Sequence, residues 1–221
     1  MSYIVKDRLF NLRLEPIVYL RDGCTVGFEA LSRLAERSHH GSFDYARFFS
    51  DLSVDESINI IERQLEIYQK WSAQHPEIYD EKSLFINVSP LVLEDRDACN
   101  CFIPFLRYFN IAIEVDNHIS MMSERAKKNI AVLKSYGMQI WVDDFDGCGN
   151  INDSFWNGVK IDRWAFQDNF KLASSGNRGS NYSDVMHVGP LVIEGIENED
   201  HLEYALSIGA RYGQGYLWAA H

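Results

Sequence analysis

Polar and ionisable side chains interrupt a series of short apolar runs, at points where a buried strand would normally stay apolar. The runs are GFEAL, FINVSP, IAIEVD, WVDDF, VKID and VIEGIE, and the interrupting residues are Glu29, Asn87, Glu114, Asp143, Asp144, Lys160 and Glu194. Burying so many ionisable groups separately would be very costly. We therefore expect these side chains to converge in one place.

The chemistry of this set favours hard divalent cations. Several carboxylates and one carboxamide supply oxygen ligands, with no Cys or His among them, which suits Mg²⁺ or Mn²⁺ better than zinc. Of the adjacent pair Asp143 and Asp144, one can bridge two metals while the other reaches only the second. Two metal ions can hold a phosphodiester and activate water against it. Lys160 could orient or help deprotonate that water, or neutralise developing charge.

Each residue alone would have an ordinary explanation. An isolated Glu29 or Glu194 is more often a surface or salt-bridged residue, and an isolated Lys160 is usually solvated. Asn87 alone would be a turn or cap residue, and two adjacent aspartates are common in loops. The argument rests on the whole series, which recurs on successive strands.

The elements that must position these residues alternate between strand and helix. Short, mostly non-alternating apolar runs predict buried parallel strands. We expect them at Leu14–Leu20, Thr25–Leu31, Leu84–Val88, Ile111–Val115, Ile140–Asp144, Val159–Asp162 and Leu191–Gly195. The tight RDGC turn predicts that the first two strands form an antiparallel hairpin. The remainder predicts a parallel sheet with helices outside it. If these strands close into a barrel, the active site would lie at their carboxyl ends.

Three helices are expected between these strands. Ser53–Ala73 begins with a capping box formed by Ser53 and Glu56, and Ser123–Tyr136 ends before a glycine. Leu202–Ile208 ends before a glycine in the same way. The polar stretch Ala173–Asp184 predicts an exposed loop.

Composition limits the class of protein. The 221 residues suit one domain over 1–221, and a hydrophobic content of 46% is enough for a sizeable core. The formal net charge of −11 argues against binding to duplex nucleic acid, but not against a nucleotide substrate held through divalent cations. Without a signal peptide or a membrane span, the protein is expected to be soluble and cytoplasmic, with its four cysteines reduced.

These motifs, in this order, resemble the EAL domain family. The similarity runs from about Leu14 to Leu217 and includes EPIVYLRDGCTVGFEALSRL, FINVSP, IAIEVD, WVDDFD, VKIDR, VIEGIE and YGQGYL. The resemblance implies a TIM-like (β/α) barrel with an antiparallel N-terminal strand. It also implies hydrolysis of cyclic di-GMP to linear pGpG with two Mg²⁺ or Mn²⁺ ions, in the bacterial signalling that governs biofilm formation and motility. A homodimer is implied as well.

The resemblance also implies residue roles. Glu29, Asn87, Glu114 and Asp143 match ligands of one metal, whereas Asp143, Asp144 and nearby Glu194 match ligands of the second. Catalysis is assigned to Lys160, Glu29 and Glu194. Arg33 matches an arginine that pairs with a substrate phosphate, and Gln214 a glutamine that positions the nucleophile. Glu197 and the position of Asn117 match residues that support the ligands from behind.

The sequence departs from the family in places that bear on activity. Asn117 replaces a glutamate that anchors the loop after the paired aspartates, and that loop, at 145–150, is itself altered. The polar stretch at 173–184 partly replaces an expected helix. An active phosphodiesterase remains the first hypothesis, because every expected metal-ligand position is filled. The alternative is a catalytically weak or inactive EAL domain that acts as a cyclic di-GMP receptor or as a regulator that binds a protein partner.

Overall fold

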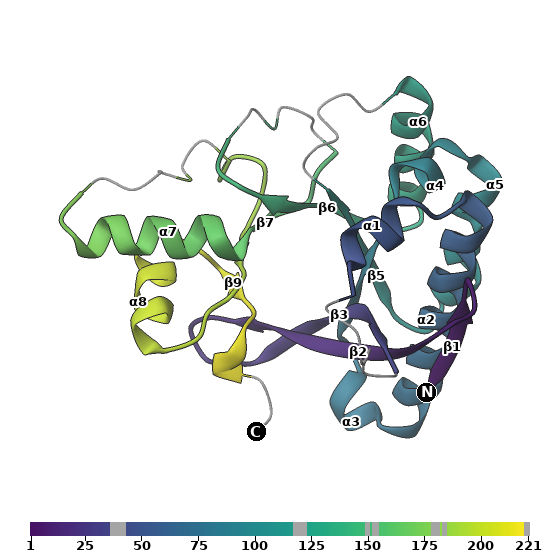
Figure 1. Cartoon of the computed structure of the whole chain (residues 1–221), viewed down its shortest axis with the longest axis horizontal. Coiled ribbons are helices and arrows are strands. Elements are labelled where there is room, and N and C mark those ends of the chain that lie inside the picture. The colour runs from purple at the N-terminus through teal and green to yellow at the C-terminus, as the bar shows by residue number, and fades with distance from the viewer. Residues whose placement is uncertain are drawn as a thin grey trace.

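The strands form a closed barrel with one additional strand on its outside. The computed structural model describes residues 1–35, 43–116, 123–148, 151, 155–177, 182 and 185–218. Neighbouring strands pair in sequence order, and β2 also pairs with β9, which closes the ring (Figure 1). The strands are β1 (Ser2–Val5), β2 (Arg8–Tyr19), β3 (Thr25–Leu34), β4 (Ser83–Asn87), β5 (Asn110–Asp116), β6 (Gln139–Phe145), β7 (Gly158–Ile161), β8 (Leu191–Ile193) and β9 (Tyr212–Gly213).

Strand β2 runs against its neighbours, as the hairpin prediction requires. It is antiparallel to both β3 and β9, whereas each successive pair from β3 to β9 is parallel. The turn between β2 and β3 is closed by a hydrogen bond from the Tyr19 N–H to the Cys24 carbonyl, at 2.9 Å. The fold is therefore the expected α/β barrel with an antiparallel N-terminal strand.

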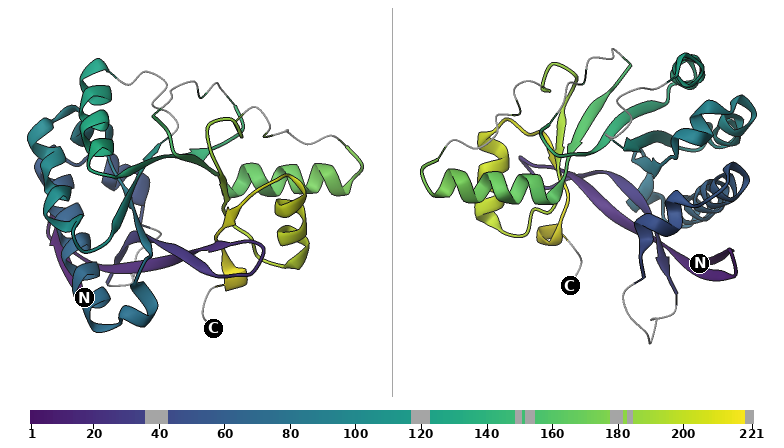
Figure 2. Two further views of the ribbon diagram at one scale, coloured as in Figure 1. Left: turned by 180° about the vertical axis from the view of Figure 1, so that it is seen from behind. Right: turned by 45° about the horizontal axis from the view of Figure 1, so that its top comes forward.

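Helices cover the barrel on two flanks, which Figure 2 shows as a blue-to-teal group and a green-to-yellow group. The helical segments are α1 (Tyr45–Ser50), α2 (Val54–Gln74), α3 (Pro76–Tyr79), α4 (Pro90–Glu94), α5 (Arg96–Cys99), η1 (Asn100–Phe105), α6 (Glu124–Ser135), α7 (Arg163–Ser174), α8 (Glu199–Ser207) and η3 (Tyr216–Trp218). Large apolar clusters fill the layers between helices and barrel, and a smaller cluster that includes Phe85, Trp141 and Val192 lies apart from them.

The three expected helices are present, although α8 begins at Glu199, three residues before the predicted start at Leu202. The Ser53 side chain accepts a hydrogen bond from the Glu56 N–H, and Glu56 accepts one from the Ser53 N–H, so the capping box at the start of α2 is formed. Helix α6 begins at its cap Ser123. Gly137 and Gly209 follow α6 and α8 with φ of 89° and 84°, the left-handed conformation that ends helices.

Other elements differ from expectation. Strands β1 and β9 and helix α7 were not predicted from the sequence. The predicted exposed loop at 173–184 is wrong at both ends of its described part, because Ala173 and Ser174 belong to α7 and Tyr182 is buried. Tyr182 accepts a hydrogen bond from the Asn169 side chain at 2.6 Å, which holds it against that helix. Among the described residues, no helix is long and apolar enough to cross a membrane.

Candidate active site

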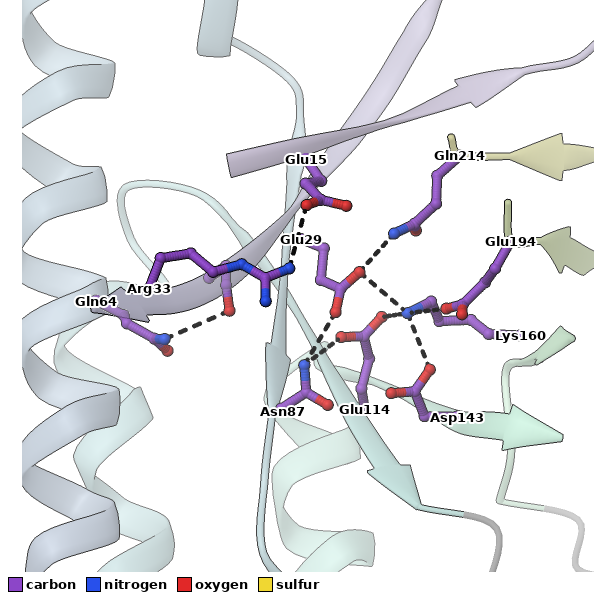
Figure 3. A network of polar contacts seen from close by, with 11 residues as sticks. Glu15, Glu29, Arg33, Gln64, Asn87, Glu114, Asp143, Lys160, Glu194 and Gln214 are labelled. Carbon is purple, nitrogen blue, oxygen red and sulfur yellow. Dashed lines mark hydrogen bonds and ion pairs between the residues drawn. The ribbon is translucent and has the colours of Figure 1, made fainter. Parts of the chain in front are cut away.

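The barrel brings the predicted polar residues together from different strands. Glu29, Glu114, Asp143 and Lys160 come from β3, β5, β6 and β7 and are buried. Asn87 ends β4, and Glu194 and Gln214 directly follow β8 and β9. Figure 3 shows all of these side chains pointing toward a common centre. This convergence agrees with the expectation from the sequence.

The Lys160 ammonium group lies at that centre. Its Nζ is 2.8 Å from Glu114 Oε1, 2.9 Å from Asp143 Oδ1, 2.8 Å from Glu194 Oε1 and 3.3 Å from Glu29 Oε2 (Figure 3). The residue is fully buried, with a relative exposure of 0%. A buried cation is tolerable only when anionic partners surround it, as they do here.

Glu29 is held by amide groups as well as by Lys160. Gln214 Nε2 donates to Glu29 Oε2 at 2.6 Å, and Asn87 Nδ2 donates to Glu29 Oε1 at 3.1 Å. Asn87 Nδ2 also lies 3.3 Å from Glu114 Oε2. To act as a cation ligand, Asn87 would have to turn its amide over and present Oδ1.

The electrostatics follow from burial and crowding. Burial works to lower the pKa of Lys160, but the surrounding carboxylates outweigh it and raise that pKa well above its usual value. Burial raises the pKa of Glu114 and of Asp143, and raises that of Glu194 to about 8, against the opposing charge of Lys160. Glu29 is the exception: burial would raise its pKa, but Lys160 and the two amides lower it. More carboxylates than cations are therefore gathered here.

This excess of buried oxygen atoms fits divalent cations. One carboxylate oxygen each from Glu29, Glu114 and Asp143 lie within 4.8 Å of one another, and so do oxygens of Asp143, Asp144 and Glu194. Glu114 Oε1 and Asp143 Oδ1 are close to Lys160 Nζ, yet neither accepts a hydrogen bond of good geometry from the described residues. Asp143 belongs to both groups, as expected for a ligand that bridges two ions.

Asp144 differs from Asp143 in conformation and exposure. Its backbone has φ of 51°, an uncommon value for a residue other than glycine, and the residue as a whole is exposed whereas Asp143 is buried. Partial desolvation of its carboxyl group and the neighbouring Asp143 charge raise the pKa of Asp144 to about 6. The two carboxylates therefore present one buried and one open oxygen donor at the end of β6.

Arg33 lies beside this centre and already has an anionic partner. Its Nη2 is 3.5 Å from Glu15 Oε1, and its guanidinium carbon is 5.6 Å from the centre of the Tyr45 ring (Figure 3). Glu15 was missed in the sequence, although it lies in the EPI segment of β2 and pairs in register with Glu29 on β3. Directly opposed residues of antiparallel strands share a face, which could have identified Glu15.

The two positions that were expected to support the metal ligands have different outcomes. Glu197 pairs with Arg163 and accepts a hydrogen bond from Gln167 at 3.4 Å. Asn117 lies outside the described residues, as do 149 and 150 of the altered loop and part of the 173–184 stretch. The roles assigned to these positions therefore stay predictions.

Comparison with known proteins identifies relatives of the whole chain. The family model of the EAL domain matches residues 3–221. The cyclic di-GMP phosphodiesterase TpdA of Vibrio parahaemolyticus is 25% identical over 231 residues, which cover 100% of this chain and 38% of that protein. The chain thus spans much less than two thirds of this relative's length.

Solved structures share the fold. The EAL enzyme Bd1971, in its form bound to cAMP and cyclic di-GMP, matches with a TM-score of 0.79 at 24% identity, over 96% of this chain and 61% of that one. BlrP1 of Klebsiella pneumoniae, in a complex with calcium and cyclic di-GMP, matches with a TM-score of 0.70 at 20% identity, over 96% of this chain and 55% of that one. Both likenesses are evidence for the barrel.

Proposed function

Because the chain belongs to the EAL domain family, we propose that it hydrolyses cyclic di-GMP to linear pGpG and so lowers the level of this second messenger in bacterial signalling. The observation that carries the proposal is the pair of carboxylate groups that share Asp143. A two-metal phosphodiesterase uses this arrangement to hold its ions, whereas a purely structural cluster would gain nothing from an excess of buried carboxylates. The similarity to TpdA, a cyclic di-GMP phosphodiesterase, supports the same substrate.

Two Mg²⁺ or Mn²⁺ ions are proposed as cofactors. Glu29, Glu114 and Asp143, with Asn87, would hold the first, and Asp143 and Asp144, with Glu194, would hold the second. When bound, such ions lower the pKa of water and offset the negative charge of the phosphate.

The side chains around these ions divide the remaining work. In the reaction, the oxygen of water bonds to one phosphorus, the bond from that phosphorus to the 3′ oxygen breaks, and a proton reaches the leaving oxygen. Lys160 would orient the water through its ammonium group, next to Glu29 and Glu194. Arg33 would hold a phosphate oxygen with its guanidinium fork. Gln214 holds Glu29 in place through its 2.6 Å hydrogen bond.

Residues 1–221 are proposed to form a single EAL domain that acts as a homodimer, in pathways such as biofilm formation and motility. The domain bounds, the homodimer and these pathways are inferred from membership of the EAL domain family.

The test is turnover of cyclic di-GMP by the purified chain with Mn²⁺ or Mg²⁺, beside Glu29→Ala and a binding titration in Ca²⁺. We expect pGpG from the wild-type chain, and turnover lower by orders of magnitude in the variant. Tight binding without product would instead indicate a cyclic di-GMP receptor. Neither binding nor product would indicate a protein-binding regulator.

A further inference from the structure

Three residues form an exposed aromatic and cationic cluster that the proposed chemistry does not use. The Arg163 guanidinium carbon lies 5.2 Å from the centre of the Trp164 ring and 5.9 Å from that of the Tyr216 ring. Trp164 is 65% exposed and Tyr216 is 61% exposed. Among the large hydrophobic residues that the structure describes, these are the two most exposed aromatic residues. We call Arg163, Trp164 and Tyr216 the aromatic platform.

The platform lies on the same rim of the barrel as the candidate active site. Trp164 begins four residues after Lys160, just past β7, and Tyr216 lies two residues after Gln214, just past β9. Strands β7, β8 and β9 are parallel, so the segments that follow them emerge at one end of the barrel. Consecutive Cα atoms are 3.8 Å apart, so the Cα atoms of Tyr216 and Gln214 are separated by at most about 8 Å.

Contacts with the loop after β8 fix the platform to the site. The Arg163 side chain packs over Gly195, the neighbour of Glu194, so closely that a Cβ at Gly195 would lie 2.3 Å from Arg163 Cγ. Arg163 Nη2 pairs with Glu197, whereas its buried Nε has no hydrogen-bond partner in the described part of the chain. Arg163 is thus held between Gly195 and Glu197, and both rings gather around it.

From this geometry we infer that the aromatic platform binds a purine base of the cyclic dinucleotide by stacking. Every base has a π-face that stacks on aromatic rings, and an arginine beside the stack strengthens it. A flat aromatic ligand would cover rings that are otherwise exposed to water at the mouth of a phosphodiester site. The inference rests on the proposed function, because the phosphate centre fixes where the base would reach.

The test measures binding of cyclic di-GMP in Ca²⁺ to the wild-type chain and to Trp164→Ala, Tyr216→Ala and Trp164→Phe. Loss of one base–aromatic stack weakens binding by about 5- to 150-fold, so we expect a rise of this size in Kd for Trp164→Ala and a rise for Tyr216→Ala. Trp164→Phe keeps an aromatic ring and should bind within about threefold of wild type. The matched control is Tyr108→Ala, because Tyr108 is 48% exposed and lies 4.6 Å from the Arg107 guanidinium.

Two further readouts separate stacking from damage to the fold. Bound guanine should quench the part of the tryptophan fluorescence that Trp164→Phe removes. Hydrolysis of bis(p-nitrophenyl) phosphate, which carries no purine, should be less affected by Trp164→Ala than hydrolysis of cyclic di-GMP.

The outcomes distinguish the platform from the proposed function. Suppose that the wild-type chain binds cyclic di-GMP, and that Trp164→Ala and Tyr216→Ala bind it equally well. The inference that the platform binds a base is then wrong, whereas the proposed function stands. The same holds if these variants change only the oligomeric state, which would make the platform a protein interface. If the wild-type chain does not bind cyclic di-GMP, the proposed function and the platform both fail.

Discussion

The Lys160 ammonium group holds together four carboxylates that would otherwise repel one another. Each has an oxygen between 2.8 and 3.3 Å from its Nζ, and the lysine itself is fully buried. Removing one partner of a buried ion pair is strongly destabilising, because it leaves uncompensated charge. In the absence of metal, Lys160 therefore substitutes in part for the cations that the carboxylates are suited to bind.

This view predicts that the cost of losing Lys160 depends on metal. In EDTA, Lys160→Met should lower the free energy of unfolding by about 3–5 kcal/mol. Added Mn²⁺ should restore part of the loss, because the ions neutralise the same carboxylates. Urea unfolding with and without Mn²⁺ measures both values. The control is Lys171→Met, which removes an exposed lysine 2.9 Å from Asp168; equal losses in the two variants would contradict the prediction.

Glu15 forms an ion pair with Arg33. Its carboxylate oxygen lies 3.5 Å from the guanidinium group that we propose binds a substrate phosphate. The pair is partly exposed, with side-chain exposures of 44% for Arg33 and 28% for Glu15, so its contribution is modest. A substrate phosphate must compete with Glu15 for the arginine and approach a like charge.

Glu15→Gln should therefore improve substrate binding more than chemistry. We expect KM for cyclic di-GMP to fall by up to about fivefold, with kcat little changed, since exposed pairs are worth about 1 kcal/mol or less. Steady-state kinetics at low and moderate salt would show the effect shrinking as salt rises. Glu66→Gln serves as the control, because Glu66 pairs with Arg63 on the surface of α2. An unchanged or higher KM in Glu15→Gln would refute the competition.

At the scale of elements, caps have measurable energetic consequences. Ser53 starts α2, which contributes Gln64 to a buried polar network at β3: Gln64 Nε2 donates to Ser32 Oγ at 3.1 Å, one residue before Arg33 (Figure 3). The cap therefore supports the helix that packs behind the strand carrying Glu29 and Arg33.

Ser53→Ala should lower stability by about 1 kcal/mol, the usual cost of losing such a cap. For a chain of this size, Tm should fall by about 2–4 °C, which calorimetry or circular dichroism can measure. Ser135→Ala is the matched control, because the Ser135 hydroxyl donates only to the Val132 carbonyl within α6 among the described contacts. A Tm that does not differ between the two variants would mean that the cap contributes nothing.

The elements differ in how well they could be predicted from the sequence. Strands β4 to β8 could be predicted because each contains consecutive apolar residues that are buried on both faces, and α2 and α6 because their caps are local patterns. Strand β9 has two residues, and β1 alternates over only four, so neither pattern rises above chance. Helix α7 was missed because few of its side chains are buried, Phe166 and Asn169 among them.

Most of the candidate site could also be predicted from local sequence patterns. Charged residues inside apolar runs are conspicuous, so Glu29, Glu114 and Lys160 could be identified without a structure. Glu15 lies in the mixed sequence LRLEP, where a charged residue attracts no attention, and its position depends on pairing with β3. The Arg163–Glu197 pair joins the first residue of α7 to the segment that follows β8, a contact that only the closed barrel defines.

At the scale of the whole molecule, the excess of acidic over basic residues bears on cation binding. The chain carries a formal net charge of −11, and part of that charge is buried in the barrel. A cation that binds the folded chain and not the unfolded one stabilises it by mass action. Because Asp143 belongs to both carboxylate groups, the two proposed ions should lose affinity together when Asp143 changes.

Melting curves test this coupling. At a Mn²⁺ concentration of 100 times its Kd, stabilisation of about 2.7 kcal/mol is expected for one site, a rise of about 5–10 °C in Tm for a chain of this size. Asp143→Asn should abolish most of that rise, whereas Asp168→Asn, on the exposed face of α7, should retain it. An equal rise in Tm for Asp143→Asn would mean that the cations bind elsewhere on the chain. The proposed phosphodiesterase function would then lose its main support. A rise confined to the wild type and the control would link the buried negative charge of the barrel to the cations that its proposed reaction needs.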